Sequence, residues 1–313
     1  MILPYLTSLM PEHPLYLSLA KQTHWPLIKI ETRSFPDTES YLRLDPSPIL
    51  KNDHAIKPVF VFHDLSEPNK SILNLVFLSE LLQNYGATHV YLISPYLAYM
   101  RQDNIFHKGE GITAQYFSNL LKSYFKGLIT IDPHLHRIKS LTQLYPADFI
   151  PNVISSTPEL ARWLIANHPD SVLIGPDAES TQWVKNLAEK TKLSYLIFNK
   201  IRTGDKQVQV SLSAEQQTWL KKQNKQPILI DDIISSAQTM IQAVQYLQII
   251  YPEYPAICVG IHALLNTLSY ESLLKAGAKQ VYSTNTIRHQ SNHIDLSDLF
   301  VSAVVHYYNC LKF

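Results

Sequence analysis

Short apolar runs rich in β-branched residues alternate along the chain with longer stretches in which apolar residues recur at helical spacing. Such runs favour strands and such stretches favour helices. The runs that predict strands are 27–31, 59–62, 90–93, 128–131, 172–175, 195–198, 228–230, 257–260 and 280–283. Several are apolar on both faces, which is typical of strands in a parallel sheet covered by helices on both sides. The pattern predicts an α/β protein with doubly wound parallel sheets.

Two segments in different halves of the chain share one pattern. Residues 59–64 and residues 228–232 each form an apolar run that ends in an acid, and each precedes a hydroxyl-containing turn and a helical stretch. This internal repeat predicts two similar domains. The length of 313 residues agrees, because single cores stop growing at roughly 250 to 300 residues. A polar stretch at 151–157 marks the boundary, so we expect domains at 1–153 and 154–313.

Composition narrows the classes of partner and location. The apolar fraction of 46% and charged fraction of 17% are those of a globular protein. A net charge of +1 provides no long-range field, so we expect neither nucleic acid nor a membrane as partner. Cys258 and Cys310 sit among apolar neighbours and are predicted to be core residues. The chain begins without a basic signal-like region and contains no run of membrane-spanning length, which favours the cytoplasm.

The segment 227–239 joins an apolar strand, two acids and a hydroxyl-rich turn to a helix at 240–250. Its polar part contains Asp231, Asp232, Ser235, Ser236, Ala237, Gln238 and Thr239. A helix N-terminus offers backbone N–H groups and partial positive charge, so this turn can bind a phosphate without a lysine. The two carboxylates suit sugar hydroxyls or a magnesium-bound water. Alternatively, Ser236 is only an N-cap and the acids are ordinary first-turn carboxylates.

Five further segments combine aromatic, acidic and basic residues near expected strand ends. They are Phe35-Pro36-Asp37-Thr38-Glu39, Arg101-Gln102-Asp103 with Gly111-Ile112-Thr113-Ala114 after it, Asp132-Pro133-His134, Gly175-Pro176-Asp177, and Lys200-Ile201-Arg202. Together with 227–239, they resemble the motifs of the ribose-phosphate diphosphokinase family, in that family's order. The resemblance runs from about residue 15 to Thr286. It implies two similar domains of phosphoribosyltransferase type, with ATP on the first and ribose 5-phosphate at the loop of the second.

The resemblance implies an ATP site made of Phe35, Asp37, Thr38, Glu39, Arg101 and Gln102. An aromatic face suits a purine, and carboxylates suit its amine and the ribose. The planar guanidinium of Arg101 suits phosphate or adenine, although a surface pair with Asp103 is the ordinary alternative. Residues 35–37 alone would be just a turn. In the family this loop reaches a neighbouring subunit, which implies a homo-oligomer, either a dimer or an assembly of dimers.

The resemblance also implies that His134 and Asp177 serve at Mg²⁺. A neutral imidazole is an unusual direct ligand for this hard cation, so a role through water stays open for His134. His136 completes a His-x-His pair, but no third ligand at a suitable spacing supports zinc, and we interpret it as structural or as a residue that supports a metal ligand without binding the ion. Asp177 falls where ligands bind in open α/β sheets, at a strand's carboxyl end. Its ordinary alternative is a helix cap.

Lys200 and Arg202 resemble the cationic pair at the base of the family's flap and are the predicted catalytic residues. Residues two apart in an extended chain point the same way, so both can reach one polyphosphate. Residues 203–205 follow as a hinge-like turn. The ordinary alternative is a solvated basic pair on an edge strand.

The implied reaction transfers diphosphate from ATP to the C1 hydroxyl of ribose 5-phosphate and yields phosphoribosyl pyrophosphate and AMP, for nucleotide biosynthesis. Ribose 5-phosphate would contact Arg202, Asp231, Asp232 and residues 235–239. A phosphoribosyltransferase explains 227–250 but neither Arg101-Gln102 nor paired domains. A catalytically silent regulatory subunit is the other alternative, and the retained Lys200 counts against it. The chain contains no Walker loop and no Gly-x-Gly-x-x-Gly for ATP.

Two departures from the family's commoner pattern concern neighbouring segments. Residues 104–110 lack most basic residues of the commoner bacterial and animal enzymes and are closer to the archaeal type, which leaves allosteric control by phosphate or ADP open. In the phosphate turn, Ser235 replaces an acid, as in archaeal-type members, and Gln238 replaces a glycine. Glycine lets a backbone approach phosphate without an intervening Cβ. We therefore expect Gln238 to point outward or to use its amide on the ligand.

Overall fold

The computed structural model describes residues 3–50, 57–105, 107–202 and 208–311. It divides into two compact units, Met1–Ile154 with Ser297–Phe313, and Ser155–Leu296. The second range differs from the expected domain 154–313 at its end. Helix α10 (Ser297–Cys310) packs against α1 (Pro14–Thr23) of the first unit. The chain's last helix joins the first unit because its aromatic side chains complete that unit's core, where Phe300 contacts Phe62 with ring centroids 6.1 Å apart.

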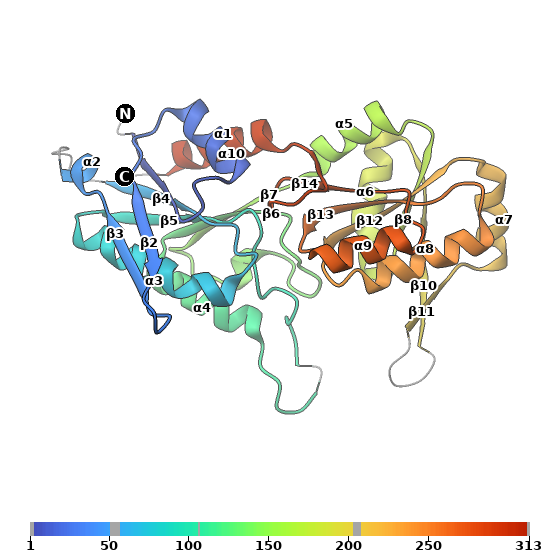
Figure 1. The fold of residues 1–313 in the computed structure, drawn as a ribbon, viewed down its shortest axis with the longest axis horizontal. Coiled ribbons are helices and arrows are strands. Elements are labelled where there is room, and N and C mark those ends of the chain that lie inside the picture. The colour runs from blue at the N-terminus through green and yellow to red at the C-terminus, as the bar shows by residue number, and fades with distance from the viewer. Residues whose placement is uncertain (1–2, 51–56, 106, 203–207, 312–313) are drawn as a thin grey trace. The chain divides into compact units, whose positions relative to one another are not determined.

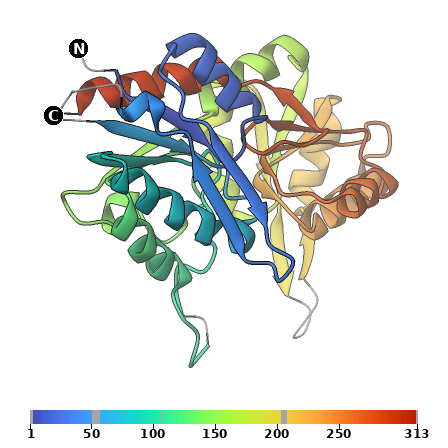
Figure 2. The ribbon, with the colours of Figure 1, turned by 60° about the vertical axis from the view of Figure 1, so that its left-hand side comes forward.

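The first unit contains a parallel sheet of five strands in the order β1-β4-β5-β6-β7. These strands are β1 (Tyr5–Ser8), β4 (Pro58–Phe62), β5 (His89–Ile93), β6 (Gly127–Ile131) and β7 (Ile150–Ile154). All side chains of β4 and β6 are buried, as the continuous apolar runs predicted. One face of the sheet carries α1 and α10, and the other carries α3 (Pro68–Asn84) and α4 (Thr113–Tyr124) (Figures 1 and 2). Two short helices, α2 (Ser47–Leu50) and η1 (Leu141–Gln143), lie in connections.

An antiparallel hairpin of β2 (Ile30–Ser34) and β3 (Ser40–Leu44) also belongs to the first unit. The sequence predicted a strand of the parallel sheet at 27–31, and this part of the prediction is wrong. Leu27 makes only an isolated parallel bridge to Leu6 before the chain leaves the sheet. The side chains from Glu31 to Ser34 are exposed, so no buried apolar face holds this segment in the main sheet.

The second unit contains a parallel sheet of six strands in the order β15-β14-β13-β12-β8-β9. They are β8 (Ser171–Gly175), β9 (Ser194–Ile197), β12 (Gln226–Ile234), β13 (Ile257–Ala263), β14 (Gln280–Thr284) and β15 (Asn292–Ile294). Helices α5 (Thr157–Asn167) and α6 (Thr181–Thr191) pack together, as do α8 (Gln238–Ile250) and α9 (Thr267–Lys275), on opposite faces of the sheet (Figure 1). The unit also contains η2 (Ala178–Ser180), α7 (Ala214–Gln223) and the hairpin of β10 (Asn199–Arg202) and β11 (Val208–Ser211). The prediction of two parallel-sheet domains with helices on both faces is confirmed.

Buried apolar side chains of α8 form the centre of one core of the second unit. Met240, Ala243, Val244 and Leu247 pack there with strand residues such as Cys258. The prediction of a buried Cys258 is confirmed, whereas the prediction for Cys310 is wrong. Cys310 is exposed at the end of α10, with its Sγ atom 3.6 Å from Nε2 of His306. Its apolar sequence neighbours face the core while this position of the helix faces away from it.

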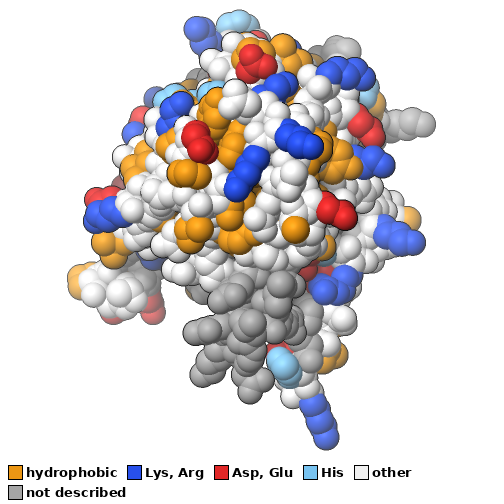
Figure 3. Space-filling model, turned by 90° about the vertical axis from the view of Figure 1, so that its right-hand side faces the viewer, with side chains coloured by type: hydrophobic (Ala, Val, Ile, Leu, Met, Phe, Trp, Pro, Cys, Tyr) orange, Lys and Arg blue, Asp and Glu red, His pale blue; other side chains and the backbone are white. Residues whose placement is uncertain are grey.

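Two surface properties bear on the expected partners. Across the described ranges, no helix is both long and apolar enough to cross a membrane. On the face drawn in Figure 3, lysine and arginine side chains are interspersed with acidic and hydrophobic ones rather than gathered into one charged field. This mixed surface agrees with the small net charge of +1.

Candidate functional site

The carboxyl ends of neighbouring strands in the second unit bring three acids together. Asp177 follows β8, and Asp231 and Asp232 lie near the end of β12, the parallel neighbour of β8. Burial raises the pKa of Asp231 well above its ordinary value, and the charges of Asp232 and Asp177 raise it further. The N–H of Asp232 donates to Oδ1 of Asp231 at 3.0 Å, which opposes this rise. The edge is therefore a place where a cation would be stabilised.

Asp177 is held in place by the first turn of the chain beyond β8. Its Oδ1 accepts hydrogen bonds from the N–H groups of Glu179 at 3.0 Å and Ser180 at 3.3 Å. The Ser180 hydroxyl also donates to the Asp177 carbonyl at 2.6 Å. A Cβ at Gly175 would lie 2.2 Å from this hydroxyl oxygen, so the close turn requires a glycine. Asp177 thus caps η2, and the cap fixes its carboxylate at the strand end.

The phosphate turn leads directly from β12 into α8. Helix α8 begins at Gln238, and its N-cap is Ala237 in the left-handed conformation, with φ of 60°. The alternative interpretation that Ser236 is the N-cap is therefore wrong. Gln238 is exposed and points outward, which is one of the two conformations anticipated from the sequence. The N-terminus of α8 follows within a few residues of Asp231 and Asp232, so N–H groups and carboxylates belong to one short segment.

The cationic pair lies on the β10–β11 hairpin. Lys200 is opposite Val210 and Arg202 is opposite Val208 in the antiparallel register. The register places the backbone of both residues in the hairpin. Their side chains, like the predicted hinge at 203–205, lie outside the described parts of the chain.

The predicted adenine loop is the tip of the β2–β3 hairpin. The N–H of Phe35 donates to the Glu39 carbonyl at 2.8 Å, and the N–H of Thr38 donates to the Phe35 carbonyl at 2.9 Å. Oδ1 of Asp37 accepts from the Glu39 N–H at 3.3 Å. Thr38 adopts a φ of 74°, a strained conformation for a β-branched residue. These bonds define a tight turn on which the Phe35 side chain is 39% exposed.

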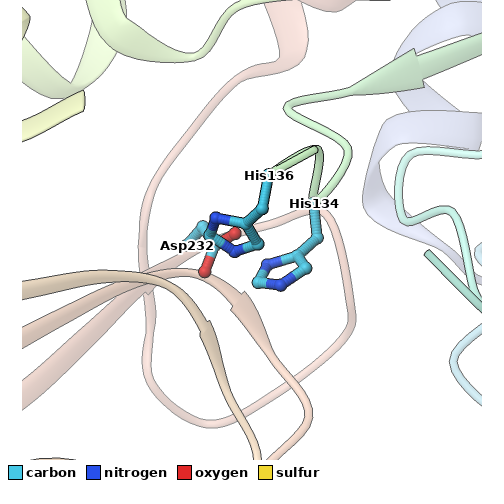
Figure 4. Close-up of side chains that lie close together, drawn as sticks. All are labelled: His134, His136 and Asp232. Atoms are coloured by element: carbon cyan, nitrogen blue, oxygen red, sulfur yellow. The ribbon is translucent and has the colours of Figure 1, made fainter. Parts of the chain in front are cut away.

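The loops after β5 and β6 carry the other predicted residues of the first unit. Arg101 is exposed and Gln102 is half-buried, and the Gln102 carbonyl accepts the Ala114 N–H at 3.2 Å. The rings of His134 and His136 pack edge to face, with centroids 3.9 Å apart (Figure 4). His134 is half-buried, and His136 is exposed.

Two residues that sequence reasoning missed support these segments. Arg137 donates two hydrogen bonds to the carboxylate of Asp103. Arg33 places its guanidinium over the Phe35 ring. A basic residue next to each motif was the available signal, but a lone arginine near a loop is too common to single out. Only the folded chain shows which acid or ring it contacts.

The fold and the acidic sheet edge beside a phosphate-binding type of turn define a protein of phosphoribosyltransferase type. Residues 150–300 match the phosphoribosyl transferase domain, and residues 5–124 match the N-terminal domain of ribose phosphate pyrophosphokinase. The ribose-phosphate pyrophosphokinase of Sulfolobus acidocaldarius is 30% identical over 280 residues, which cover 87% of this chain and 89% of that protein. The ribose-phosphate pyrophosphokinase of Sulfurisphaera tokodaii is 30% identical over 288 residues, which cover 90% of this chain and 92% of that protein. The chain belongs to the ribose-phosphate pyrophosphokinase family.

The fold comparison agrees with this assignment. The crystal structure of phosphoribosylpyrophosphate synthetase from Mycobacterium smegmatis superposes with a TM-score of 0.77 and covers 98% of this chain and 99% of that one. At 19% identity this likeness concerns the fold alone. The predictions of the family, of its archaeal-type resemblance and of the fold class are confirmed.

Proposed function

We propose that this enzyme transfers the diphosphate group of ATP to the C1 hydroxyl of ribose 5-phosphate and releases phosphoribosyl pyrophosphate and AMP. The observation that carries the proposal is the edge of the second sheet. Asp177, Asp231 and Asp232 lie there, beside the turn 235–239 and the N-terminus of α8. The family membership of the chain supports the same reaction.

The turn 235–239 is the proposed site of the sugar phosphate. Backbone N–H groups at the start of α8 and the partial positive charge of that helix end favour a dianionic phosphate. Ser235 and Thr239 are half-buried and Ser236 is exposed, and their hydroxyls are proposed as further donors to the phosphate. Asp231 and Asp232 accept hydrogen bonds from sugar hydroxyls. This arrangement orients the C1 hydroxyl without covalent chemistry.

Lys200 and Arg202 are the proposed catalytic cations. Diphosphate transfer needs positioning and neutralisation of negative charge more than it needs a nucleophilic side chain. Residues two apart in an extended chain point the same way, so the spacing of Lys200 and Arg202 on β10 supports joint action on one polyphosphate. In this proposal Arg202 also contacts ribose 5-phosphate.

The donor set fits a magnesium ion. Mg²⁺ prefers oxygen ligands. Burial first, and then the charges of Asp232 and Asp177, raise the pKa of Asp231, and a divalent cation would offset that negative charge. Asp177 would hold the ion directly, and the imidazole of His134 would act through a coordinated water. When bound, the ion neutralises polyphosphate charge and orients its oxygen atoms.

ATP is proposed to bind through Phe35, Asp37, Thr38 and Glu39 of the hairpin tip, together with Arg101 and Gln102. The exposed Phe35 ring offers an aromatic face for adenine. Part of the proposal is that this loop serves a neighbouring subunit of a homo-oligomer, a dimer or an assembly of dimers. The cytoplasm remains the predicted location.

The direct experiment incubates the purified protein with ATP, Mg²⁺ and ribose 5-phosphate and quantifies AMP and phosphoribosyl pyrophosphate by chromatography. Lys200→Ala should lower the turnover number by about 10³ to 10⁵, with circular dichroism unchanged. Lys221→Ala, an exposed cation on α7, is the matched control and should retain wild-type turnover. Nucleotide formation from phosphoribosyl pyrophosphate and a free base, without AMP release from ATP, would instead indicate a phosphoribosyltransferase. No turnover in either assay would indicate a silent subunit.

A further inference from the structure

The carboxylate of Asp103 is bound from two directions by one residue. The backbone N–H of Arg137 donates to Oδ2 at 3.0 Å, and the guanidinium Nη1 donates to Oδ1 at 2.9 Å. The Asp103 side chain is 2% exposed, whereas that of Arg137 is 48% exposed. The two residues are 34 positions apart in the chain, so the contact joins separate loops.

Each of these loops carries residues of the proposed site. Asp103 directly follows Arg101 and Gln102 in the loop after β5, and Arg137 directly follows His134 and His136 in the loop after β6. Strands β5 and β6 are parallel neighbours, so both loops leave the same edge of the first sheet. The contact therefore lies between the proposed ATP-binding segment and the proposed cation-binding segment within one unit.

The burial of Asp103 makes this contact stronger than an ordinary surface ion pair. Exposed pairs contribute little because water and salt screen them. A buried carboxylate must be neutralised and hydrogen-bonded, and removal of its partner leaves an unpaired charge. The backbone N–H to Oδ2 bond also fixes the Arg137 main chain, and so constrains the residues that precede it. Bonds from one residue to both carboxylate oxygens specify orientation as well as distance.

We infer that Asp103 and Arg137 are positioning residues that hold the Arg101–Gln102 segment and the His134 segment in one arrangement. Through this link, binding of the nucleotide favours binding of its divalent cation, and the converse holds by reciprocity. The inference rests on the proposed function, because that function assigns ATP to one segment and the cation to the other. Neither residue contacts the reacting atoms in this account.

The test compares Arg137→Ala, Arg137→Lys and Asp103→Asn with wild type. Loss of one charge-assisted bond corresponds to a change of about tenfold or more in an equilibrium. Arg137→Ala should raise both the KM for ATP and the Mg²⁺ concentration for half-maximal activity by about tenfold. Its kcat should change far less, and the KM for ribose 5-phosphate should stay at the wild-type value. Arg137→Lys keeps a cationic donor and should recover part of the loss.

A binding readout separates positioning from general damage. The affinity for α,β-methylene ATP, which resists cleavage, is measured by calorimetric titration with and without Mg²⁺. The ratio of the two affinities measures the coupling between nucleotide binding and cation binding. That ratio should fall by about tenfold in Arg137→Ala. Lys139→Ala removes an exposed cation of the same segment and should leave the ratio unchanged. The double variant Asp103→Asn with Arg137→Ala should lose no more than the worse single variant.

A wild-type ratio in folded Arg137→Ala would overturn the inference, as would equal increases in the KM of both substrates. If Arg137→Ala fails to fold, the same criteria apply to Arg137→Lys and Asp103→Asn. Failure of the proposed function is distinguishable, because wild-type protein would then release no AMP in the direct assay. Wild-type turnover together with unchanged coupling in the variants would refute only the positioning role.

Discussion

The guanidinium group of Arg33 lies over the ring of Phe35, with Cζ 4.7 Å from the ring centroid. The same group is 4.2 Å from the ring centroid of Tyr41, the residue directly opposite Arg33 across the β2–β3 hairpin. The Phe35 and Tyr41 rings meet edge to face with centroids 6.1 Å apart. This contact holds an exposed aromatic ring in one orientation at the tip of a tight turn, where the proposed function places adenine.

Replacement of Arg33 by glutamine should therefore weaken ATP binding. A cation–π contact at an exposed site contributes about 0.5–1 kcal/mol, which corresponds to a two- to fivefold increase in the KM for ATP. The KM for ribose 5-phosphate should not change. Arg43→Gln is the matched control, because Arg43 lies on the same hairpin and pairs with Glu31 at 3.6 Å, with both side chains exposed. An equal effect of the two substitutions on the KM for ATP would contradict the assignment.

Asp231→Asn should stabilise the fold and abolish turnover. Burial first, and then the charges of Asp232 and Asp177, raise the pKa of Asp231 in the folded protein. When the pKa of a carboxyl group is higher in the folded than in the unfolded protein, the folded state is most stable with that group protonated. This contribution to the free energy of unfolding is lost as the pH rises through the pKa of the folded state. Asparagine removes this loss, so urea unfolding at pH 7.5 should give a higher midpoint. The same change removes an acceptor for the sugar.

Glu189→Gln is the control for the urea unfolding of Asp231→Asn, because Glu189 is an exposed acid on α6. This variant should keep the unfolding midpoint and the turnover number near wild type. Addition of Mg²⁺ should raise the unfolding midpoint of wild type more than that of Asp231→Asn, because the ion offsets the charge that asparagine lacks. A lower urea-unfolding midpoint for Asp231→Asn than for wild type would show that the Asp231 carboxylate stabilises the fold instead.

The first unit should lose stability below about pH 6.5, the ordinary pKa of a histidine. His63 is 7% exposed, and its Nδ1 accepts the Leu65 N–H at 3.0 Å. Burial lowers the pKa of His63, Asp64 opposes this effect, and His13 adds to it. The folded form therefore favours neutral His63, while the unfolded chain binds a proton more readily. Neutral His63 therefore stabilises the folded protein at a pH above the pKa of histidine in the unfolded chain. This stabilisation is lost as the pH falls below that pKa.

Urea unfolding of wild type and His63→Gln between pH 8 and pH 5.5 measures this effect. The variant should show a shallower decline on acidification, because glutamine does not titrate. His306→Gln, an exposed histidine of α10 in the same unit, should decline as wild type does. Parallel pH profiles for wild type and His63→Gln would rule out His63 as the group responsible.

Gln238→Gly should change the KM for ribose 5-phosphate by less than about threefold. Gln238 is exposed at the first position of α8, and the left-handed residue of the turn is Ala237, which is buried. Ala237→Val should have the larger effect, because Ala237 is buried at a φ of 60° and a β-branched residue is especially unfavourable in this conformation. Steady-state kinetics of the two variants measure the KM for ribose 5-phosphate and show which of the two residues affects it. A strong effect of Gln238→Gly alone would show that the Gln238 side chain contacts the phosphate.

Local patterns in the sequence determined the elements and the location of the motifs. Short apolar runs predicted eight strands of the two parallel sheets, and the pattern is clearest in β4, β6 and β8, where every residue is buried. The resemblance to the family's motifs singled out Asp177, and the rule that ligands bind at strand carboxyl ends agrees with its position after an apolar run. Family motifs added expected roles, which local chemistry alone left open between a phosphate site and an ordinary helix cap.

Tertiary structure decided which distant residues meet. The link between Asp103 and Arg137 spans 34 positions, and no periodicity indicates it. The assignment of α10 to the first unit depends on aromatic packing across almost the whole chain. Strand and helix patterns arise from neighbours within a few residues, so the sequence displays them directly. Long-range pairing depends on which surfaces exclude water and satisfy buried charge once the elements pack, and that is a property of the folded chain.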